Sequence, residues 1–259
     1  GRRTRFRFWR REAWGFKSLH AHHFIGLSMK RESSNTIRWL MEDVLPPFVR
    51  DSAFFALLMT KVYPLVTDFS DFRRRAHVLT AEEYSALYAR IDRIHDDTDN
   101  SVAILEALRA EMVPGTVLDV GCGTGYTLGY LGQQVQGLAL TGVDFQIAEK
   151  ARETWPEVTF YEHDMMRLPF EDGAFDTVIS THTLEHILDI RAAVAELRRV
   201  CRKKLILVVP REREGLYTFN PHFHFFPYVH SFLRVLIPLP TRYRCRDIGR
   251  DIFYVEEKE

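Results

Sequence analysis

A glycine-rich stretch near the middle of the chain has the residue types and spacing to hold a ligand. An apolar run with Asp119 near its end precedes three glycines at alternate positions. Where a buried strand passes through glycines into a helix, the backbone can approach a ligand that any Cβ would obstruct. The residues that would line this ligand are Asp119, Gly121, Gly123, Gly125 and Tyr126. The GxGxG spacing differs from the GxGxxG that surrounds pyrophosphate, and the Asp119 carboxylate suits a zwitterionic or cationic group.

A second acid, Asp144, ends the next apolar run, 25 residues beyond Asp119. In a doubly wound sheet this position lies across a crevice from the glycine loop, where a carboxylate can accept hydrogen bonds from both hydroxyls of a ribose. Each such bond to a charged acceptor contributes about 1.5 to 3 kcal/mol. NAD-binding proteins use the same arrangement, so Asp144 predicts a ribose without distinguishing between nucleotide cofactors.

Histidines gather after the fourth and fifth predicted strands, at His182, His186, His222, His224 and His230. Open α/β sheets bind substrates at the carboxyl ends of their strands, and histidine is the natural general base near neutral pH. By position, His182 is the first candidate for a base. The alternatives are His186, His222 and His224. Each of these histidines could instead be packed in the protein interior or exposed to solvent without a catalytic role.

The spacing of His222 and His224 is one that a divalent metal can use. No carboxylate cluster is fixed at a matching position, and the acidic run over residues 96–99 reads more simply as a helix N-cap. The cysteines show no spacing typical of metal ligands and indicate core thiols in a reducing compartment; they are Cys122, Cys201 and Cys245. We therefore expect no metal site.

These residues would be positioned by an alternation of strands and helices. Apolar or β-branched runs, separated by helical segments of ten to twenty residues, predict parallel strands over Thr116–Val120, Leu138–Val143, Val158–Tyr161, Phe175–Ser180 and Leu205–Val209. Tyr243–Ile248 and Asp251–Val255 read as an antiparallel hairpin. The expected fold is α/β: a Rossmann-like three-layer sandwich with a mostly parallel seven-stranded sheet and a C-terminal antiparallel hairpin.

Three regions are expected along the chain. Residues 1–28 form a basic extension, in which seven Arg and Lys residues face one acid, Glu12. Residues 29–100 form an N-terminal helical cap, with helices over Thr36–Leu45, Ala53–Tyr63 and Ala81–Ile94, the last capped by Thr80. Residues 101–259 form the core, which opens with a helix over Asp99–Met112. The segment 53–66 is interrupted by Lys61 and Pro64 and is too short to span a bilayer.

One further stretch makes the pattern specific. It runs from His163 to Ser180 (HDMMRLPFEDGAFDTVIS) and is followed by Thr183-Leu184-Glu185-His186. With the glycine motif and Asp144, it resembles class I S-adenosylmethionine (SAM)-dependent methyltransferases, in the branch that contains ubiquinone-biosynthesis and many natural-product and sugar methyltransferases. The resemblance covers roughly residues 113–210, with the motifs in order. The cap and the tail after Pro210 are only loosely similar.

The resemblance implies a role for each matching position. Asp119 and the three glycines would hold the methionine moiety of SAM, and Asp144 would bind its ribose. Phe145 would lie against the adenine, and Asp164 with Met165 would recognise its edge. Thr181 and His182 would flank the sulfonium. The product of the cofactor would be S-adenosylhomocysteine.

Three functions are carried forward as hypotheses. The first is O-methylation of a glycan or small-molecule hydroxyl, which a histidine-rich, aromatic acceptor side suits. The second is C- or N-methylation of a quinone, lipid or other metabolite, and the third is a catalytically silent SAM-binding partner subunit. A nucleic-acid substrate is disfavoured because Thr181-His182-Thr183-Leu184 replaces the Asn/Asp-Pro-Pro-Tyr/Phe signature that grips a flipped base.

The expected partner is a small-molecule or glycan acceptor, free or lipid-linked. Equal numbers of basic and acidic residues, 35 each, give no global charge that calls for nucleic acid. For the N-terminal region the alternatives are a lid over the active site, a homodimer face, a peripheral membrane contact, or burial in an ordinary helical core. We expect the protein in the cytoplasm, either free or at the inner face of a membrane.

Overall fold

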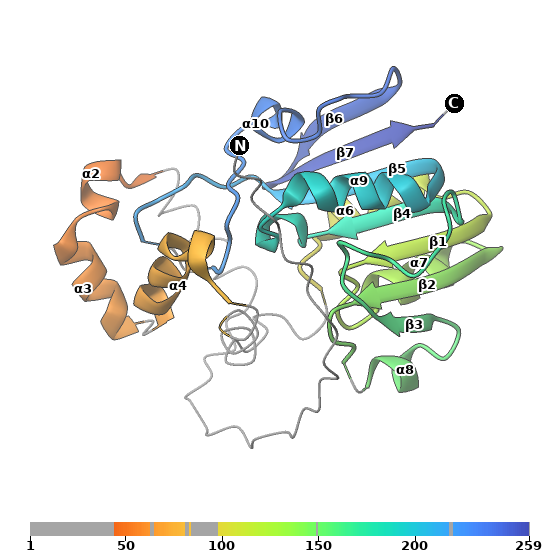
Figure 1. Ribbon diagram of the computed structural model, residues 1–259, viewed down its shortest axis with the longest axis horizontal. Coiled ribbons are helices and arrows are strands. Elements are labelled where there is room, and N and C mark those ends of the chain that lie inside the picture. The colour runs from red at the N-terminus through yellow and green to blue at the C-terminus, as the bar shows by residue number, and fades with distance from the viewer. Residues whose placement is uncertain are drawn as a thin grey trace, which may run out of the picture.

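The computed structural model describes residues 44–62, 65–80, 83, 98–148, 150–217 and 220–258. Figure 1 shows a twisted sheet with helices on both faces and a separate group of short helices beside one end of it. That group comprises α2 (Pro47–Arg50), α3 (Ala53–Val62), α4 (Leu65–Arg74) and the 3-10 turn η2 (Ala76–Val78).

Several of the expected N-terminal features lie outside the described residues. These are the basic extension over 1–28, nearly all of the helix over 36–45, and the helix over 81–94 except residue 83. The predicted N-cap of the last helix is described: the Thr80 hydroxyl accepts a hydrogen bond from the Glu83 amide at 3.2 Å, and a Glu83 carboxylate oxygen accepts one from the Thr80 amide at 2.9 Å. This reciprocal pair is a capping box.

Seven strands form one sheet in the order β3-β2-β1-β4-β5-β7-β6. Their bounds are β1 (Gly115–Val120), β2 (Leu138–Asp144), β3 (Thr159–Glu162), β4 (Phe175–Thr181), β5 (Cys201–Pro210), β6 (Tyr243–Ile248) and β7 (Asp251–Glu257). The first five are parallel, and β7 lies antiparallel between β5 and β6. The predicted fold class is confirmed. The strand order reverses between β1 and β4, so their carboxyl ends flank the crevice where such sheets bind ligands.

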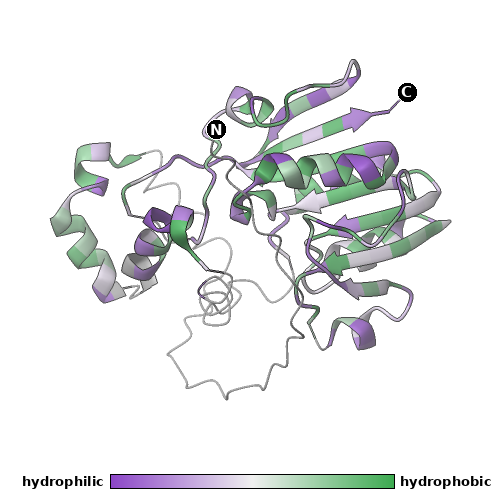
Figure 2. Ribbon diagram, in the orientation of Figure 1, coloured by the Kyte–Doolittle hydropathy of each residue, from purple (hydrophilic) through white to green (hydrophobic). Residues whose placement is uncertain are grey.

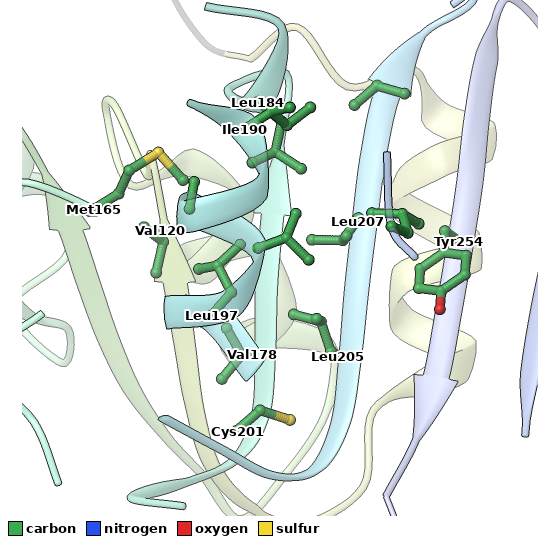
Figure 3. Close-up of a cluster of buried hydrophobic side chains, with 14 of the residues drawn as sticks. Val120, Met165, Val178, Leu184, Ile190, Leu197, Cys201, Leu205, Leu207 and Tyr254 are labelled. Atoms are coloured by element: carbon green, nitrogen blue, oxygen red, sulfur yellow. The ribbon is translucent and has the colours of Figure 1, made fainter. Parts of the chain in front are cut away.

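Helices cover both faces of the sheet, and each face has its own apolar cluster. The helices of this part are α6 (Val102–Glu111), α7 (Tyr126–Gln134), α8 (Ala151–Thr154), the 3-10 turn η3 (Leu184–His186), α9 (Ile190–Val200) and α10 (Val229–Leu233). On one face, Ile190 and Leu197 of α9 lie over Val178 and Leu207 of the central strands, as Figure 3 shows. On the other face, α6 and α7 pack against β1 and β2. This is the three-layer sandwich that the sequence predicts.

The connection from β3 to β4 differs from the prediction. We expect a helical segment between successive strands, but residues 163–174, all of them described, contain turns and no helix. Pro169 lacks the amide that a helix needs, and Gly173 adopts a φ of 63°. The segment is anchored by Arg199 of α9, which donates to the carbonyls of Leu168 and Phe170 at 3.2 and 2.7 Å.

The short N-terminal helices are attached to the segment that follows β5. Arg50 of α2 donates to the Glu214 carbonyl at 3.0 Å, and Arg73 of α4 donates to the carbonyls of Gly215 and Leu216. Such charge-assisted bonds are the stronger kind. These N-terminal helices therefore hold the chain where it leaves β5 at the carboxyl edge of the sheet.

Part of the cap leaves apolar side chains in solvent. Figure 2 shows hydrophobic residues along α2 and α3, and the exposed ones are Phe48, Phe54, Leu57 and Leu58. In the described part of the chain, every helix is too short or too polar to cross a bilayer.

A buried ion pair joins the C-terminal hairpin to α9. Glu256 of β7, 2% exposed, accepts two close bonds from Arg198, at 2.9 and 2.7 Å, and one from the Tyr254 hydroxyl at 2.7 Å. We expect Glu256→Ala to lower the free energy of unfolding by about 3 kcal/mol, because it leaves a half-buried guanidinium without its partner. Urea titration measures this. Arg109→Ala, which removes an exposed ion pair with Glu106, serves as the control and should change nothing measurable; an equal effect of the two variants would contradict the account.

Candidate active site

The glycine loop follows β1 and turns sharply toward α7. Gly121 has a φ of 84°, a conformation that favours glycine, and a Cβ built there would lie 2.0 Å from the Thr183 hydroxyl oxygen. The amides of Gly121 and Cys122 both donate to the Val143 carbonyl, at 2.8 and 3.1 Å. The loop is thus bound to the end of β2, with Thr183 close against it.

Asp144, at the end of β2, lies beside the same loop. One of its carboxylate oxygens accepts a hydrogen bond from the Gly123 amide at 2.7 Å. The structure therefore brings together the glycines and the acid that the sequence predicts to share a site. The carboxylate is half-buried, so it also remains accessible to a ligand at the edge of the sheet.

Asp119 lies near the end of β1, two residues before the glycine loop. It is 1% exposed, and its Oδ1 has no hydrogen-bond partner in the described part of the chain. Burial, and then the negative charge of Asp144, raise the pKa of Asp119 to about 8. A buried carboxylate oxygen without a hydrogen-bond partner is costly. A ligand with a positive group at this point would offset that cost, so the residues present fit a cationic or zwitterionic ligand.

The residues expected to contact an adenine lie on the β2 and β3 side. Phe145 is 65% exposed, and Asp164 is exposed with one carboxylate oxygen accepting from the Met166 amide at 2.9 Å. The Met165 side chain turns into the apolar core (Figure 3), so it offers a ligand only its main chain. Tyr126 begins α7 and packs edge-on against Trp155.

Thr181 and His182 lie at the carboxyl end of β4, the strand next to β1 in the sheet. The Thr181 hydroxyl accepts a hydrogen bond at 2.9 Å from the Asn100 amide group, which also donates to Thr127 at 3.1 Å. His182 has a φ of 51°, the one positive value for a described residue other than glycine. Such strain is found where surrounding contacts impose it, often at functional sites.

The His182 ring lies between two buried carboxylates. Its Nδ1 is 3.8 Å from Glu185 Oε1, and its Nε2 is 3.8 Å from Asp251 Oδ1. Both distances are too long for hydrogen bonds, and Nε2 has none in the described part of the chain. The ring is therefore flanked by two acidic side chains and keeps one nitrogen without a hydrogen-bond partner among the described residues.

Two other predicted histidines meet next to Glu185. The rings of His186 and His222 are 4.6 Å apart, and His222 Nδ1 contacts Glu212 Oε2 at 2.7 Å. Burial, followed by the charge of His222, holds the pKa of His186 well below its usual range, and burial raises that of Glu185. The group of Glu185, His186, His222 and Glu212 is here called the His–Glu cluster.

His224 lies apart from this cluster. Its Nε2 is 2.8 Å from the Ile187 carbonyl, and its ring stacks on Phe226. Because this nitrogen is bound to the main chain, His224 fits a structural role better than the role of a general base. Sequence reasoning missed Glu212, Asp251 and Asn100 altogether. Glu185 could have been found, because it lies within the Thr183-Leu184-Glu185-His186 motif that carries the family resemblance.

Comparison with known proteins gives a family match over the segment that carries most of these residues. Residues 118–209 match the family model of the methyltransferase domain. Over these residues the chain is similar to that methyltransferase family. The matched residues include the glycine loop, Asp144, and the end of β4 with Thr181 and His182. The methyl donor that this family implies is SAM, as the sequence predicts.

The relatives that the chain matches are named for different methyl acceptors. A demethylmenaquinone methyltransferase from Roseiflexus castenholzii is 34% identical over 145 residues, covering 53% of this chain and 60% of the relative. An ajmaline N-methyltransferase from Rauvolfia serpentina is 31% identical over 106 residues, 38% of this chain and 36% of the relative. A probable tocopherol O-methyltransferase from Oryza sativa subsp. japonica is 40% identical over 101 residues, which cover 35% of this chain and 27% of the relative. The chain thus spans between about a quarter and three fifths of these relatives.

Among solved structures, the PH0226 protein from Pyrococcus horikoshii OT3 is similar with a TM-score of 0.49 and 20% identity, over 78% of this chain and 99% of that one.

Proposed function

We propose that this protein transfers a methyl group from SAM to a hydroxyl of a small-molecule or glycan acceptor. The observation that supports it most directly is the placement of His182 at the end of β4, between the carboxylates of Glu185 and Asp251. Methyl transfer from a sulfonium needs alignment of the acceptor, worth up to about 7 to 11 kcal/mol. A hydroxyl acceptor must also lose its proton, and a positioned base contributes about 10² to 10⁴ in rate.

In this proposal SAM lies across the carboxyl ends of β1 and β2. Asp119 and the loop at Gly121 hold its methionine part, and Asp144 accepts hydrogen bonds from its ribose. Phe145 covers the adenine face, and Asp164 with the Met165 main chain reads its edge. The methyl group then points toward His182 and the His–Glu cluster, where the acceptor binds.

The raised pKa of Asp119, about 8, makes SAM binding depend on pH. Below that pKa the carboxyl is protonated, and binding the ammonium and sulfonium groups favours its ionised form, so binding releases a proton. We expect the affinity for SAM to rise nearly tenfold between about pH 6 and about pH 7, and Asp119→Asn to remove most of that rise. Calorimetry at the two pH values measures both. A wild-type affinity that is flat or falls with pH would count against this role of Asp119.

Replacing His182 tests the base. We expect His182→Asn to lower kcat at least about tenfold, because the acceptor hydroxyl then keeps its proton, while SAM affinity stays within about twofold. Asparagine tolerates the positive φ of this position better than alanine does. His230→Ala, an exposed histidine of α10, is the matched control. Unchanged turnover in His182→Asn would remove the assignment.

A second candidate is C-methylation of a quinol. The Roseiflexus relative, named for demethylmenaquinone, favours it, and a base that removes a ring hydroxyl proton suits that reaction too. The two candidates differ in the product. Incubation with methyl-labelled SAM and fractionated glycans, lipids and small metabolites finds the acceptor, and carbon NMR of the labelled product separates an O-methyl from a C-methyl group. SAM binding without label in any fraction would instead favour the silent-subunit hypothesis.

A further inference from the structure

The connections after β4 and β5 place two imidazoles and a buried carboxylate together on the acceptor side of the sheet. Glu185, His186 and His222 each offer one ligand atom, and these atoms all lie within 4.8 Å of one another. We propose that these three residues bind a divalent transition-metal ion of the Zn²⁺ type. Among described residues this is the group whose spacing fits such an ion, and the sequence alone predicts no metal here.

A second group already orients each imidazole. His222 Nδ1 contacts Glu212 Oε2 at 2.7 Å. The His186 ring is hydrogen-bonded to the Pro221 carbonyl. Histidines that bind metals almost always donate their other N–H to a carboxylate or a carbonyl, because this fixes the tautomer and the ring orientation. Both histidines show this arrangement.

Glu185 supplies an independent observation. The residue is 1% exposed, and its Oε2 has no hydrogen-bond partner in the described part of the chain. Buried polar atoms without partners are rare and call for an explanation, such as a bound ion. Its main-chain carbonyl accepts bonds from the amides of Phe223 and His224 at 2.8 and 3.1 Å, so the segment carrying His222 is tied directly to Glu185.

The donor set selects the class of metal. Two imidazole nitrogens and one carboxylate suit Zn²⁺ and neighbouring first-row cations, whereas Mg²⁺ prefers oxygen ligands and bound water. Metal–ligand bonds of about 2.0 to 2.2 Å place the ligand atoms of one ion within about 3.5 Å of each other. Here those atoms lie within 4.8 Å of one another, so side-chain shifts of about 1 Å would complete the site. Three protein ligands leave a coordination position open, as in catalytic zinc sites.

The role of the ion rests on the proposed function. The open position would take the acceptor hydroxyl, and His182, whose Nδ1 is 3.8 Å from Glu185, would accept its proton. The O–H bond breaks as the oxygen forms a bond to the methyl carbon. The C–S bond of the sulfonium breaks at the same time, and S-adenosylhomocysteine leaves as a neutral thioether.

The test is calorimetric titration of the full chain with ZnCl₂ after removal of metals by a chelator. We expect Glu185→Gln and His222→Gln each to lose one equivalent of tightly bound Zn²⁺ relative to wild type, with MgCl₂ giving no matching signal. Glu212→Gln should weaken that binding by about 10- to 100-fold, and Glu212→Asp, which keeps the carboxylate, by less. His230→Ala should bind as wild type does, and visible spectra with Co²⁺ should report the same losses.

Equal Zn²⁺ binding by wild type and by folded Glu185→Gln and His222→Gln would overturn the metal site. Circular dichroism establishes that each variant is folded, and the near-isosteric Glu185→Gln keeps the test valid if His222→Gln fails to fold. SAM titrations of the same samples separate the two proposals. Intact SAM binding without the Zn²⁺ equivalent overturns the metal site alone, whereas wild-type protein that binds no SAM overturns the proposed function.

Discussion

SAM should bind Asp144→Asn at least about a hundredfold more weakly than wild type. Two hydrogen bonds from the ribose to a charged acceptor contribute about 1.5 to 3 kcal/mol each, and the amide that replaces the carboxylate keeps neither its charge nor its second acceptor. The variant also weakens the 2.7 Å bond from the Gly123 amide, which fixes the loop. Isothermal calorimetry with SAM and with S-adenosylhomocysteine gives the affinities.

Asp172→Asn is the control for the Asp144 variant. Asp172 is an exposed acid on the β3–β4 connection that pairs with Arg199 at 2.9 Å, away from the glycine loop. Its replacement should leave SAM affinity unchanged. If Asp144→Asn bound SAM within about threefold of wild type, the ribose of the ligand would not lie at Asp144.

Gly121→Ala should weaken SAM binding by about a hundredfold or more. A Cβ at this position would lie 2.0 Å from the Thr183 hydroxyl oxygen and 2.8 Å from the Thr183 Cβ, so the loop or the end of β4 must shift. In enzymes a misplacement of about 1 Å can lower the reaction rate about 10²-fold, and we expect a loss of SAM affinity of the same order here. The same calorimetry measures the effect, with circular dichroism to establish that the variant is folded.

Gly249→Ala separates the collision from backbone strain. Gly249, in the hairpin between β6 and β7, has a φ of 62°, and a Cβ there meets nothing within 4 Å. Both variants carry the strain of a positive φ, about 1 to 2 kcal/mol. Only in Gly121→Ala does the new Cβ also collide with Thr183. A folded Gly121→Ala that bound SAM as well as Gly249→Ala would show that the loop does not contact the cofactor.

The strands of the core could be predicted from the sequence because their signals are local. The apolar run before Gly121 predicts β1 to within one residue, and the hairpin around Gly249 is found as predicted. The start of β5 was missed because Cys201 is followed by Arg202, Lys203 and Lys204, whose charges interrupt the apolar pattern. Lys204 nevertheless pairs with Glu257 of β7 and bonds to Glu111 at 2.9 Å, so tertiary partners rather than local pattern place it in the strand.

The candidate site could be predicted only where one motif carries it. Asp144 and the glycine loop meet because they follow adjacent parallel strands, whose ends lie at the same edge. The His–Glu cluster and Asp251 come from η3, the segment after β5 and the start of β7. No spacing in the sequence relates Glu212 to His222 or Asp251 to His182. The approach of Asp251 to His182 depends on the pairing of β5 with β7, which sets Asp251 opposite Pro210.

The cap contributes to the site through contacts that the sequence does not reveal. Arg50 and Arg73 hold the carbonyls of Glu214, Gly215 and Leu216, a few residues before His222. Phe72 of α4 also stacks on Phe223 at 5.0 Å. The position of the segment after β5 therefore depends on helices that lie more than a hundred residues before it in the sequence.

A crystal structure of the chain with S-adenosylhomocysteine tests the central claim most directly. The account predicts the ligand over the carboxyl ends of β1 and β2, with its ribose hydroxyls within hydrogen-bond distance of Asp144 and its amino group beside Asp119. Its sulfur should face the side where His182 lies. A ligand bound elsewhere, or one whose ribose contacts neither Asp144 nor the Gly121 loop, would contradict the account.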